Sequence, residues 1–157
     1  MIRAIVIGLG NMGLSHALAL HAAEEVEVLA LVNRSPRTLP KELKNYQFLS
    51  DIDEAFALAP NLVVIATYSE SHAPLAIRAM ESGAHVFVEK PLATTVADAR
   101  AVVDTAARLN RKLVVGYILR HHPSWQRLIA EARGLGGPYV FRMNLNQQST
   151  GDEWATH

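Results

Sequence analysis

A glutamate, a lysine and a proline stand together at residues 89–91, directly after a short apolar run. A residue before proline is held extended, so Lys90 is expected to project from a strand end in a fixed direction. The bond between Lys90 and Pro91 can adopt the cis form, which is largely restricted to proline. A desolvated lysine in such a place can donate a proton to a reacting oxygen. Judged on spacing alone, the simpler interpretation is a surface lysine balanced by Glu89.

A glycine-rich turn supplies the second chemical feature. Gly8, Gly10 and Gly13 form a GxGxxG pattern between an apolar run and a helical pattern. The first glycine would make a tight turn, the second would let the backbone approach a pyrophosphate, and the third would let the helix pack closely. The motif predicts a dinucleotide site that also includes the backbone of Asn11 and Met12. Glycines are common at strand–helix turns, so a turn without a ligand is the alternative.

Asn33, Arg34 and Ser35 follow the second apolar run, where such a site contacts the ribose. Asn33 lies 20 residues beyond Gly13 and is an amide where an NAD-binding domain usually has an acidic residue. The guanidinium of Arg34 can bind a phosphate with two hydrogen bonds. We therefore expect NADP to be preferred. The alternative is that Arg34 is a solvated loop residue and that Asn33 binds the ribose of NAD.

The elements that must position these residues alternate between apolar strands and helical patterns. This alternation predicts an α/β fold, a doubly wound parallel sheet covered by helices on both faces. Asp51 and Ser71 are predicted helix caps, and Thr95 with Asp98 resembles a capping box. Strands are expected at residues 2–7, 26–32, 46–49, 62–66, 85–88 and 113–115, and helices at 11–23, 36–44, 52–58, 71–83 and 95–110.

Most of the chemically capable residues follow predicted strands. Because ligands bind outside the carboxyl ends of parallel strands, we expect these residues to gather along one edge. Besides the residues already named, this set contains Thr67, Tyr68 and His72 after the fourth strand, and Tyr117 and Arg120 after the sixth. His85 is interpreted as structural.

A change of pattern near Arg120 predicts a domain boundary. Residues 1–120 complete one nucleotide-binding unit. Residues 121–157 are too few for an independent domain. We expect a helix at 124–133 and one long strand at 139–147 there. These would be the truncated start of a second α/β domain for substrate binding or oligomerisation, so the chain is expected to stop before that domain is complete.

The composition excludes several classes of function. Lys plus Arg and Asp plus Glu each total 15, so neither nucleic acid nor an anionic membrane surface is an expected partner. The absence of cysteine excludes thiol catalysis, disulfides and thiolate metal sites, and no metal is expected. No stretch reaches the ~20 uninterrupted apolar residues of a membrane span. The apolar run over residues 4–23 is interpreted as mature structure, so a cytoplasmic location is expected.

Four segments together resemble the glucose–fructose oxidoreductase, inositol dehydrogenase and MocA family. They are the glycine turn, residues 63–67 with His72 following, residues 83–92 with their Glu-Lys-Pro, and Gly116-Tyr117 with Arg120 and Pro123. The resemblance implies a Rossmann domain followed by a larger α/β substrate domain that often binds another subunit, so the full-length enzyme could be a homo-oligomer. It also implies hydride transfer between NAD or NADP and a hydroxyl-bearing carbon of a sugar, polyol or related compound.

The same resemblance assigns roles to single residues. Lys90 would be the catalytic lysine, and Glu89 and Pro91 would set its position. Thr67, His72 and Tyr117 would lie along the dinucleotide, and Arg120 near the hinge between the domains.

The chain departs from the family pattern at several places. Tyr68 stands where the family often has proline, and Ile118 where it often has asparagine. The family's aspartate and histidine of the substrate domain would lie beyond residue 157, and Asp152 and His157 do not match their spacing. The alternative function is a non-catalytic dinucleotide-binding sensor or scaffold module, because the same fold serves both.

Overall fold

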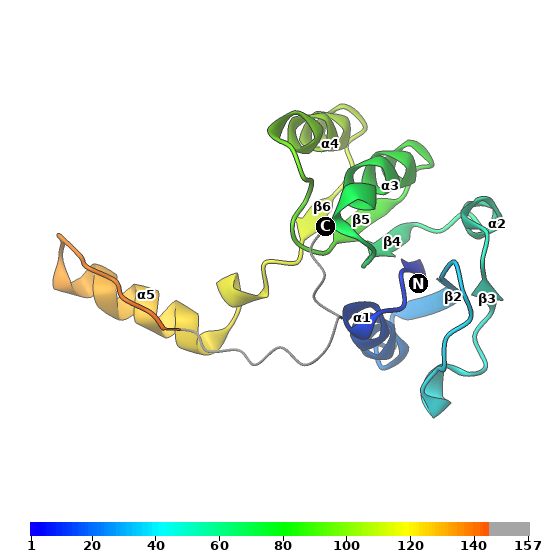
Figure 1. Ribbon diagram of the computed structural model, residues 1–157, viewed down its shortest axis with the longest axis horizontal. Coiled ribbons are helices and arrows are strands. Elements are labelled where there is room, and N and C mark those ends of the chain that lie inside the picture. Colours follow the sequence, from blue (N-terminus) through cyan, green and yellow to red (C-terminus); the bar gives the residue numbers. More distant parts are fainter. Residues whose placement is uncertain (145–157) are drawn as a thin grey trace. The chain divides into compact units, whose positions relative to one another are not determined.

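Six strands form one all-parallel sheet in the order β3-β2-β1-β4-β5-β6 (Figure 1). This computed structural model describes residues 1–144 of the chain. The order reverses between β1 and β4, as in dinucleotide-binding sheets, so the predicted doubly wound fold is confirmed. The strands are β1 (Ile2–Ile7), β2 (Val26–Val32), β3 (Phe48–Leu49), β4 (Leu62–Ile65), β5 (His85–Val88) and β6 (Leu113–Val115).

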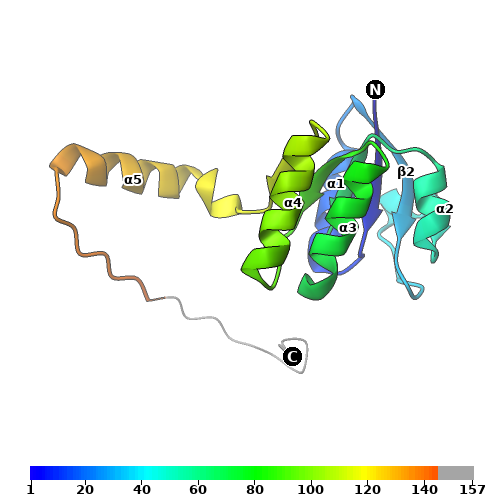
Figure 2. The same cartoon turned by 90° about the horizontal axis from the view of Figure 1, so that it is seen from above.

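Helices cover both faces of the sheet because its strands are apolar on both sides. Val6 packs with Ala17 of α1 on one face, and Ile5 packs with Ala76 of α3 on the other. Helices α3 and α4 lie side by side on that second face (Figure 2). The helices of this unit are α1 (Asn11–His21), α2 (Ile52–Ala57), α3 (Ser69–Glu81), α4 (Val96–Arg108) and the 3₁₀ turn η1 (Lys41–Leu43).

The first residue after five of the strands remains in the sheet's hydrogen-bond ladder. Each donates its backbone N–H to a neighbouring strand, so the following loop starts from a fixed position. Four of these bonds are 2.8 Å long and run from Gly8 to Val32 O, Ala66 to Ile7 O, Glu89 to Ile65 O and Gly116 to Val88 O; the fifth runs from Asn33 to Leu49 O at 3.0 Å. The loops at the carboxyl edge are therefore positioned by the sheet itself.

Two predicted caps are confirmed. The Asp53 N–H donates to Asp51 Oδ1 at 2.6 Å. The Asp98 N–H donates to Thr95 Oγ1 at 3.1 Å, and the Thr95 hydroxyl donates to Asp98 Oδ2 at 2.7 Å.

Two helix starts were predicted wrongly. α3 begins at Ser69, and the hydroxyl of Ser71, the predicted cap, donates to Tyr68 O at 2.7 Å from inside the first turn. The predicted helix over residues 36–44 is only the 3₁₀ turn η1, because Pro40 has no N–H to donate and allows helical structure only after it.

The chain divides into two units, the first of residues 1–117 and the second beginning at Ile118. Within its described part, η2 (Ile118–Arg120) precedes α5 (Pro123–Leu135), which starts with proline and is capped by His122. The strand predicted over residues 139–147 does not form in residues 139–144, where no neighbouring strand offers hydrogen bonds; residues 145–147 lie outside the described part. No helix of residues 1–144 combines the length and apolar character of a membrane crossing.

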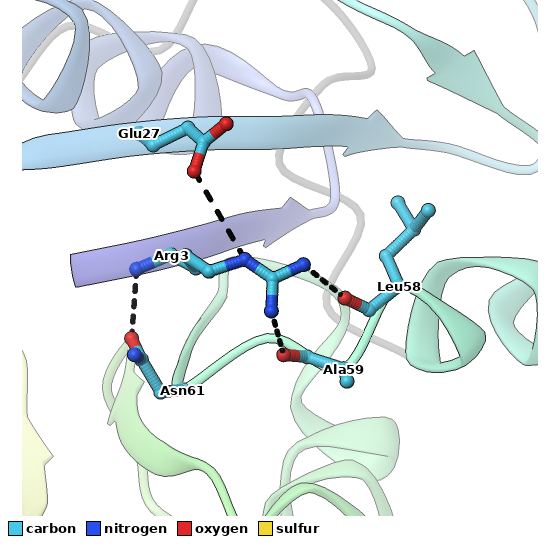
Figure 3. A network of polar contacts seen from close by, with 5 residues as sticks. All are labelled: Arg3, Glu27, Leu58, Ala59 and Asn61. Atoms are coloured by element: carbon cyan, nitrogen blue, oxygen red, sulfur yellow. Dashed lines mark hydrogen bonds and ion pairs between the residues drawn. The ribbon is translucent and has the colours of Figure 1, made fainter. Parts of the chain in front are cut away.

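Arg3 joins the amino ends of three strands, at the edge of the sheet opposite the glycine turn (Figure 3). Its guanidinium donates to Leu58 O at 2.7 Å and to Ala59 O at 3.1 Å, and lies 4.0 Å from the Glu27 carboxylate. Its backbone N–H donates to Asn61 Oδ1 at 2.8 Å. Two carbonyls of the loop before β4 are thus held by one planar donor group, which suits arginine better than lysine.

Arg3→Met should lower the free energy of unfolding by about 1–2 kcal/mol, because two carbonyls lose a charged donor while the aliphatic stem stays. Urea denaturation measures the change. Glu27→Gln is the matched control and should cost less than about 1 kcal/mol, because its ion pair with Arg3 is long and solvent-exposed. An Arg3→Met protein as stable as the parent would contradict the assigned role of the carbonyl contacts.

Candidate functional site

Two glycines of the turn after β1 are required by the fold itself. Gly8 has a φ of +90°, and a Cβ on it would lie 2.4 Å from Ala66 O. A Cβ on Gly13 would lie 1.8 Å from Gly8 O, so α1 could not approach the end of β1 with any larger residue there. Both positions are glycine for reasons of backbone packing and conformation.

Gly10 is different, because nothing in the fold requires a glycine there. Its backbone is extended, with φ −72° and ψ −172°, and a Cβ on it would meet no atom within 4 Å. The space beside it is open. A glycine kept next to open space is what close approach of a pyrophosphate to the backbone demands.

The start of α1 next to Gly10 suits an anion. No side chain caps this eleven-residue helix, and its first turn has no acidic residue. The first N–H groups of a helix have no partner within it, and they carry the positive end of the helix dipole. The open space at Gly10 and the uncapped N–H groups of Asn11, Met12 and Gly13 together fit the phosphates of a dinucleotide.

Asn33 holds the glycine turn from the end of β2. Its Oδ1 accepts the Leu9 N–H at 3.1 Å, and its Nδ2 donates to Ser35 O at 2.8 Å. Both ends of the amide are thereby engaged. The neighbouring Arg34 is exposed, and its guanidinium makes no hydrogen bond or ion pair with residues 1–144. The two predicted ribose-side residues therefore differ: Asn33 shapes the turn, and Arg34 is available.

The buried side chain of His72 bridges the loops after β4 and β5. Its Nδ1 lies 2.6 Å from Pro91 O and its Nε2 lies 3.0 Å from Thr67 O. A carbonyl only accepts, and a neutral imidazole carries one N–H, so the neutral ring donates to one of the two at a time. The side chain is only 1% exposed. The structure thus places His72 on the buried side of the two loops. Tyr68, in the loop after β4, is 75% exposed.

Lys90 stands at the surface of this edge. The Lys90–Pro91 peptide bond is cis. The lysine side chain is exposed and makes no ion pair with residues 1–144, so the expected desolvation is not present within the described residues. Glu89 is buried, at 6% exposure, and does not pair with the lysine ammonium. The simpler interpretation of a surface Lys–Glu pair is therefore not what the structure contains.

The remaining predicted residues divide between the two units. Tyr117, 43% exposed, follows β6 at the end of the first unit, whereas Arg120 belongs to η2 in the second. His85 is structural, as predicted: its Nδ1 accepts the Lys112 N–H at 3.0 Å and links β5 to the start of β6.

Sequence reasoning missed His16 on α1. Its Nε2 lies 2.8 Å from Glu89 Oε1. In the sequence this histidine only interrupts an apolar run, and 73 residues separate it from its partner. The available indication was its place one helical turn after Gly13, on the segment that packs against the sheet.

Known proteins are similar to this chain in sequence and in fold. The model of an oxidoreductase family with an NAD-binding Rossmann fold, the Gfo/Idh/MocA family, matches residues 2–117. A glycosyl hydrolase family 109 protein from Shewanella pealeana is 33% identical over 128 residues, which is 73% of this chain and 28% of that protein. Inositol 2-dehydrogenase from Salmonella typhimurium is 28% identical over 166 residues, which is 99% of this chain and 49% of that protein.

One solved structure adds a bound cofactor to the comparison. GenD2 from gentamicin A biosynthesis, in complex with NAD, is 29% identical with a TM-score of 0.78, covering 83% of this chain and 38% of that one. The chain spans about half of the length, or less, of the curated relatives named above.

The two kinds of glycine should respond differently to alanine. Gly13→Ala should cost more than about 2 kcal/mol of stability, because its methyl group overlaps a backbone carbonyl. Gly10→Ala should change stability by less than about 1 kcal/mol yet weaken NADH binding at least tenfold. Urea denaturation and a fluorescence titration with NADH measure the two effects. A Gly10→Ala protein that binds NADH like the parent would show that the open space is not the phosphate site.

Proposed function

This chain belongs to the glucose–fructose oxidoreductase, inositol dehydrogenase and MocA family, and from that membership we propose that it supplies the cofactor half of a dehydrogenase active site. The substrate would be a sugar, polyol or related compound with a hydroxyl-bearing carbon. The observation that carries the proposal is Gly10, a glycine beside open space at an uncapped helix start, on the same sheet edge as Lys90.

The order of the strands supports one direction for the dinucleotide along this edge. Its pyrophosphate would lie at the turn after β1, because that is where the glycines and the helix start are. The adenosine half would extend toward β2 and Arg34. The nicotinamide half would extend the other way, toward the loops after β4, β5 and β6, where Thr67, Lys90 and Tyr117 stand.

Bound nicotinamide supplies the hydride acceptor in this chemistry. Lys90 would handle the proton. In its neutral form the amine takes the proton of the substrate hydroxyl while the carbon of that hydroxyl gives up its hydride, and the ammonium returns the proton in the reverse reaction. Glu89 and Pro91 would hold the lysine backbone in place. His72 would keep the loops of Thr67 and Pro91 together beneath the site.

We further propose that NADP is preferred over NAD. Arg34 is exposed, follows the β2 end and has an unengaged guanidinium within residues 1–144, so it can receive a 2′-phosphate with two hydrogen bonds. Asn33 has no charge with which to repel that phosphate, unlike the acidic residue usual for NAD.

The proposal also covers the domain boundary, the oligomeric state and the location of the protein. We place the domain boundary near Arg120 and assign residues 121–157 to the beginning of a substrate or oligomerisation domain. A second copy would join through that domain. A cytoplasmic location is part of the same proposal, and cell fractionation would test it.

NADPH should bind this chain more tightly than NADH, and Arg34→Ala should remove the difference by weakening NADPH alone, about tenfold or more, since a phosphate loses its charged partner. Fluorescence titration with each nucleotide measures the effect. Arg37→Ala, an exposed arginine of the same loop, is the matched control and should leave both affinities unchanged. A parent that binds NADH more tightly would keep the family assignment and overturn the NADP preference.

In the full-length enzyme, Lys90→Met should leave NADPH binding within twofold of the parent but reduce turnover by about a hundredfold or more, because general acid–base catalysis contributes roughly 10²–10⁴. Formation of reduced nicotinamide from myo-inositol and from glucose is the assay. The matched control is Lys112→Met, which alters an exposed lysine just before β6, away from this edge, and should have no effect. Equal turnover in the full-length Lys90→Met enzyme and its full-length parent would refute the catalytic role, and a full-length parent that binds NADPH but never turns over would favour the non-catalytic module.

A further inference from the structure

Glu89 is a buried carboxylate that Lys90 does not neutralise. Its Oε1 lies 2.8 Å from His16 Nε2, and its Oε2 accepts the backbone N–H of Lys90 at 3.2 Å. Only 6% of the residue is exposed. A buried carboxylate needs hydrogen-bond donors. Among residues 1–144 the donors to Glu89 are the ring of His16, on α1, and the backbone N–H of Lys90, the next residue in the chain.

The environment leaves the carboxylate little freedom. A Cβ on Gly116 would lie 3.0 Å from Glu89 Oε1 and 3.1 Å from Oε2, so the glycine after β6 leaves room for the carboxylate. On the other side, the His16 ring meets the Phe87 ring edge to face, with centroids 4.8 Å apart and planes at 63°. The histidine is thus held by an aromatic neighbour, and the carboxylate is held by the histidine.

The contact between His16 and Glu89 also requires a hydrogen on Nε2 of the histidine. A carboxylate oxygen accepts, so Nε2 must carry a hydrogen for the 2.8 Å contact to be a hydrogen bond. His16 lies three residues after Gly13, on the helix whose start is the phosphate site. The Glu89 side chain therefore links His16, on the helix that begins at the proposed phosphate site, to the backbone of Lys90, which would face the nicotinamide half of the dinucleotide.

We propose that His16 is a positioning residue for Lys90. Through Glu89 it holds the Lys90 backbone at a set distance from α1, so that a dinucleotide bound at the helix start presents its nicotinamide to the lysine. This inference rests on the proposed function. It predicts that His16 matters to the nicotinamide half of the ligand and not to the adenosine diphosphate half.

Two ligands separate these halves: NADPH carries nicotinamide, and 2′-phospho-ADP-ribose has the same phosphates without it. His16→Ala should weaken NADPH binding about five- to tenfold, the effect of one lost hydrogen bond to a charged group. Binding of 2′-phospho-ADP-ribose should stay within twofold. His16→Gln, whose amide nitrogen can occupy the place of Nε2, should restore much of the NADPH affinity. Isothermal titration of the full chain measures all of these affinities.

A matched control comes from the same helix. His21 of α1 also makes a side-chain hydrogen bond, from Nδ1 to the Tyr46 hydroxyl at 2.9 Å, and its ring meets the Tyr46 ring edge to face. His21→Ala should leave the ratio of the two affinities unchanged. Glu89→Gln should change the ratio in the same direction as His16→Ala, and the double variant should add little, because both substitutions break one link.

The remaining outcomes each overturn the proposal. If His16→Ala weakens both ligands equally, the histidine only stabilises the fold; if it weakens neither, the link is without effect. Should that variant not fold, His16→Asn, whose shorter amide cannot reach Glu89, replaces it with the same expected ratio. A parent that binds neither ligand would refute the proposed function, and the role of His16 with it, whereas a parent that binds both leaves the function standing whatever His16 does.

Discussion

The close approach of α1 to the end of β1 is the constraint on which the site depends. It exists because Gly13 has no side chain where a Cβ would come within 1.8 Å of the Gly8 carbonyl. With the helix so close, its first N–H groups lie beside the strand end. One turn later the same helix places His16 against Glu89. The proposed phosphate site and the loop of Lys90 are therefore both positioned by one helix–strand contact.

The sheet supplies the second part of this arrangement. Because all strands run in parallel, their carboxyl ends meet at one edge, and the first residue of each of five loops is still bonded to the ladder. Side chains then connect the loops to one another. Asn33 ties the end of β2 to the glycine turn, and His72 ties the loop after β4 to that after β5. Both backbone hydrogen bonds and side-chain hydrogen bonds thus hold the loops at this edge.

Much of the fold could be predicted from the sequence, because strands covered by helices on both faces are mostly apolar. The predicted bounds 2–7, 26–32, 85–88 and 113–115 match β1, β2, β5 and β6, and the polar residues in these strands, Arg3, Glu27 and His85, stand at or near their amino ends. Prediction failed where a proline interrupts a helical pattern, and where a strand pattern has no neighbouring strand to pair with. Pro40 limits a helical pattern to one 3₁₀ turn. Residues 139–144 have a strand pattern but no neighbouring strand in the described chain.

The site could be predicted only in outline. The glycine turn and the Glu-Lys-Pro segment are visible because their spacing is local. The contacts that give Asn33, His72 and Glu89 their structural roles join residues 24, 19 and 73 positions apart, and no local pattern contains them. The sequence pattern therefore indicated which residues follow the strand ends of the first unit. It did not reveal which of them face a ligand and which support the others.

Gly10 has a consequence for how such a chain changes over evolutionary time. Gly8 and Gly13 are maintained by the fold, so selection for stability alone would preserve them. A Cβ on Gly10 would meet no atom within 4 Å and the backbone conformation there is an ordinary one, so selection for stability would act on it far less than selection for a bound molecule. In a descendant that no longer bound a dinucleotide, Gly10 would be free to drift while its two neighbours stayed. The residue at this position thus records whether binding is still under selection.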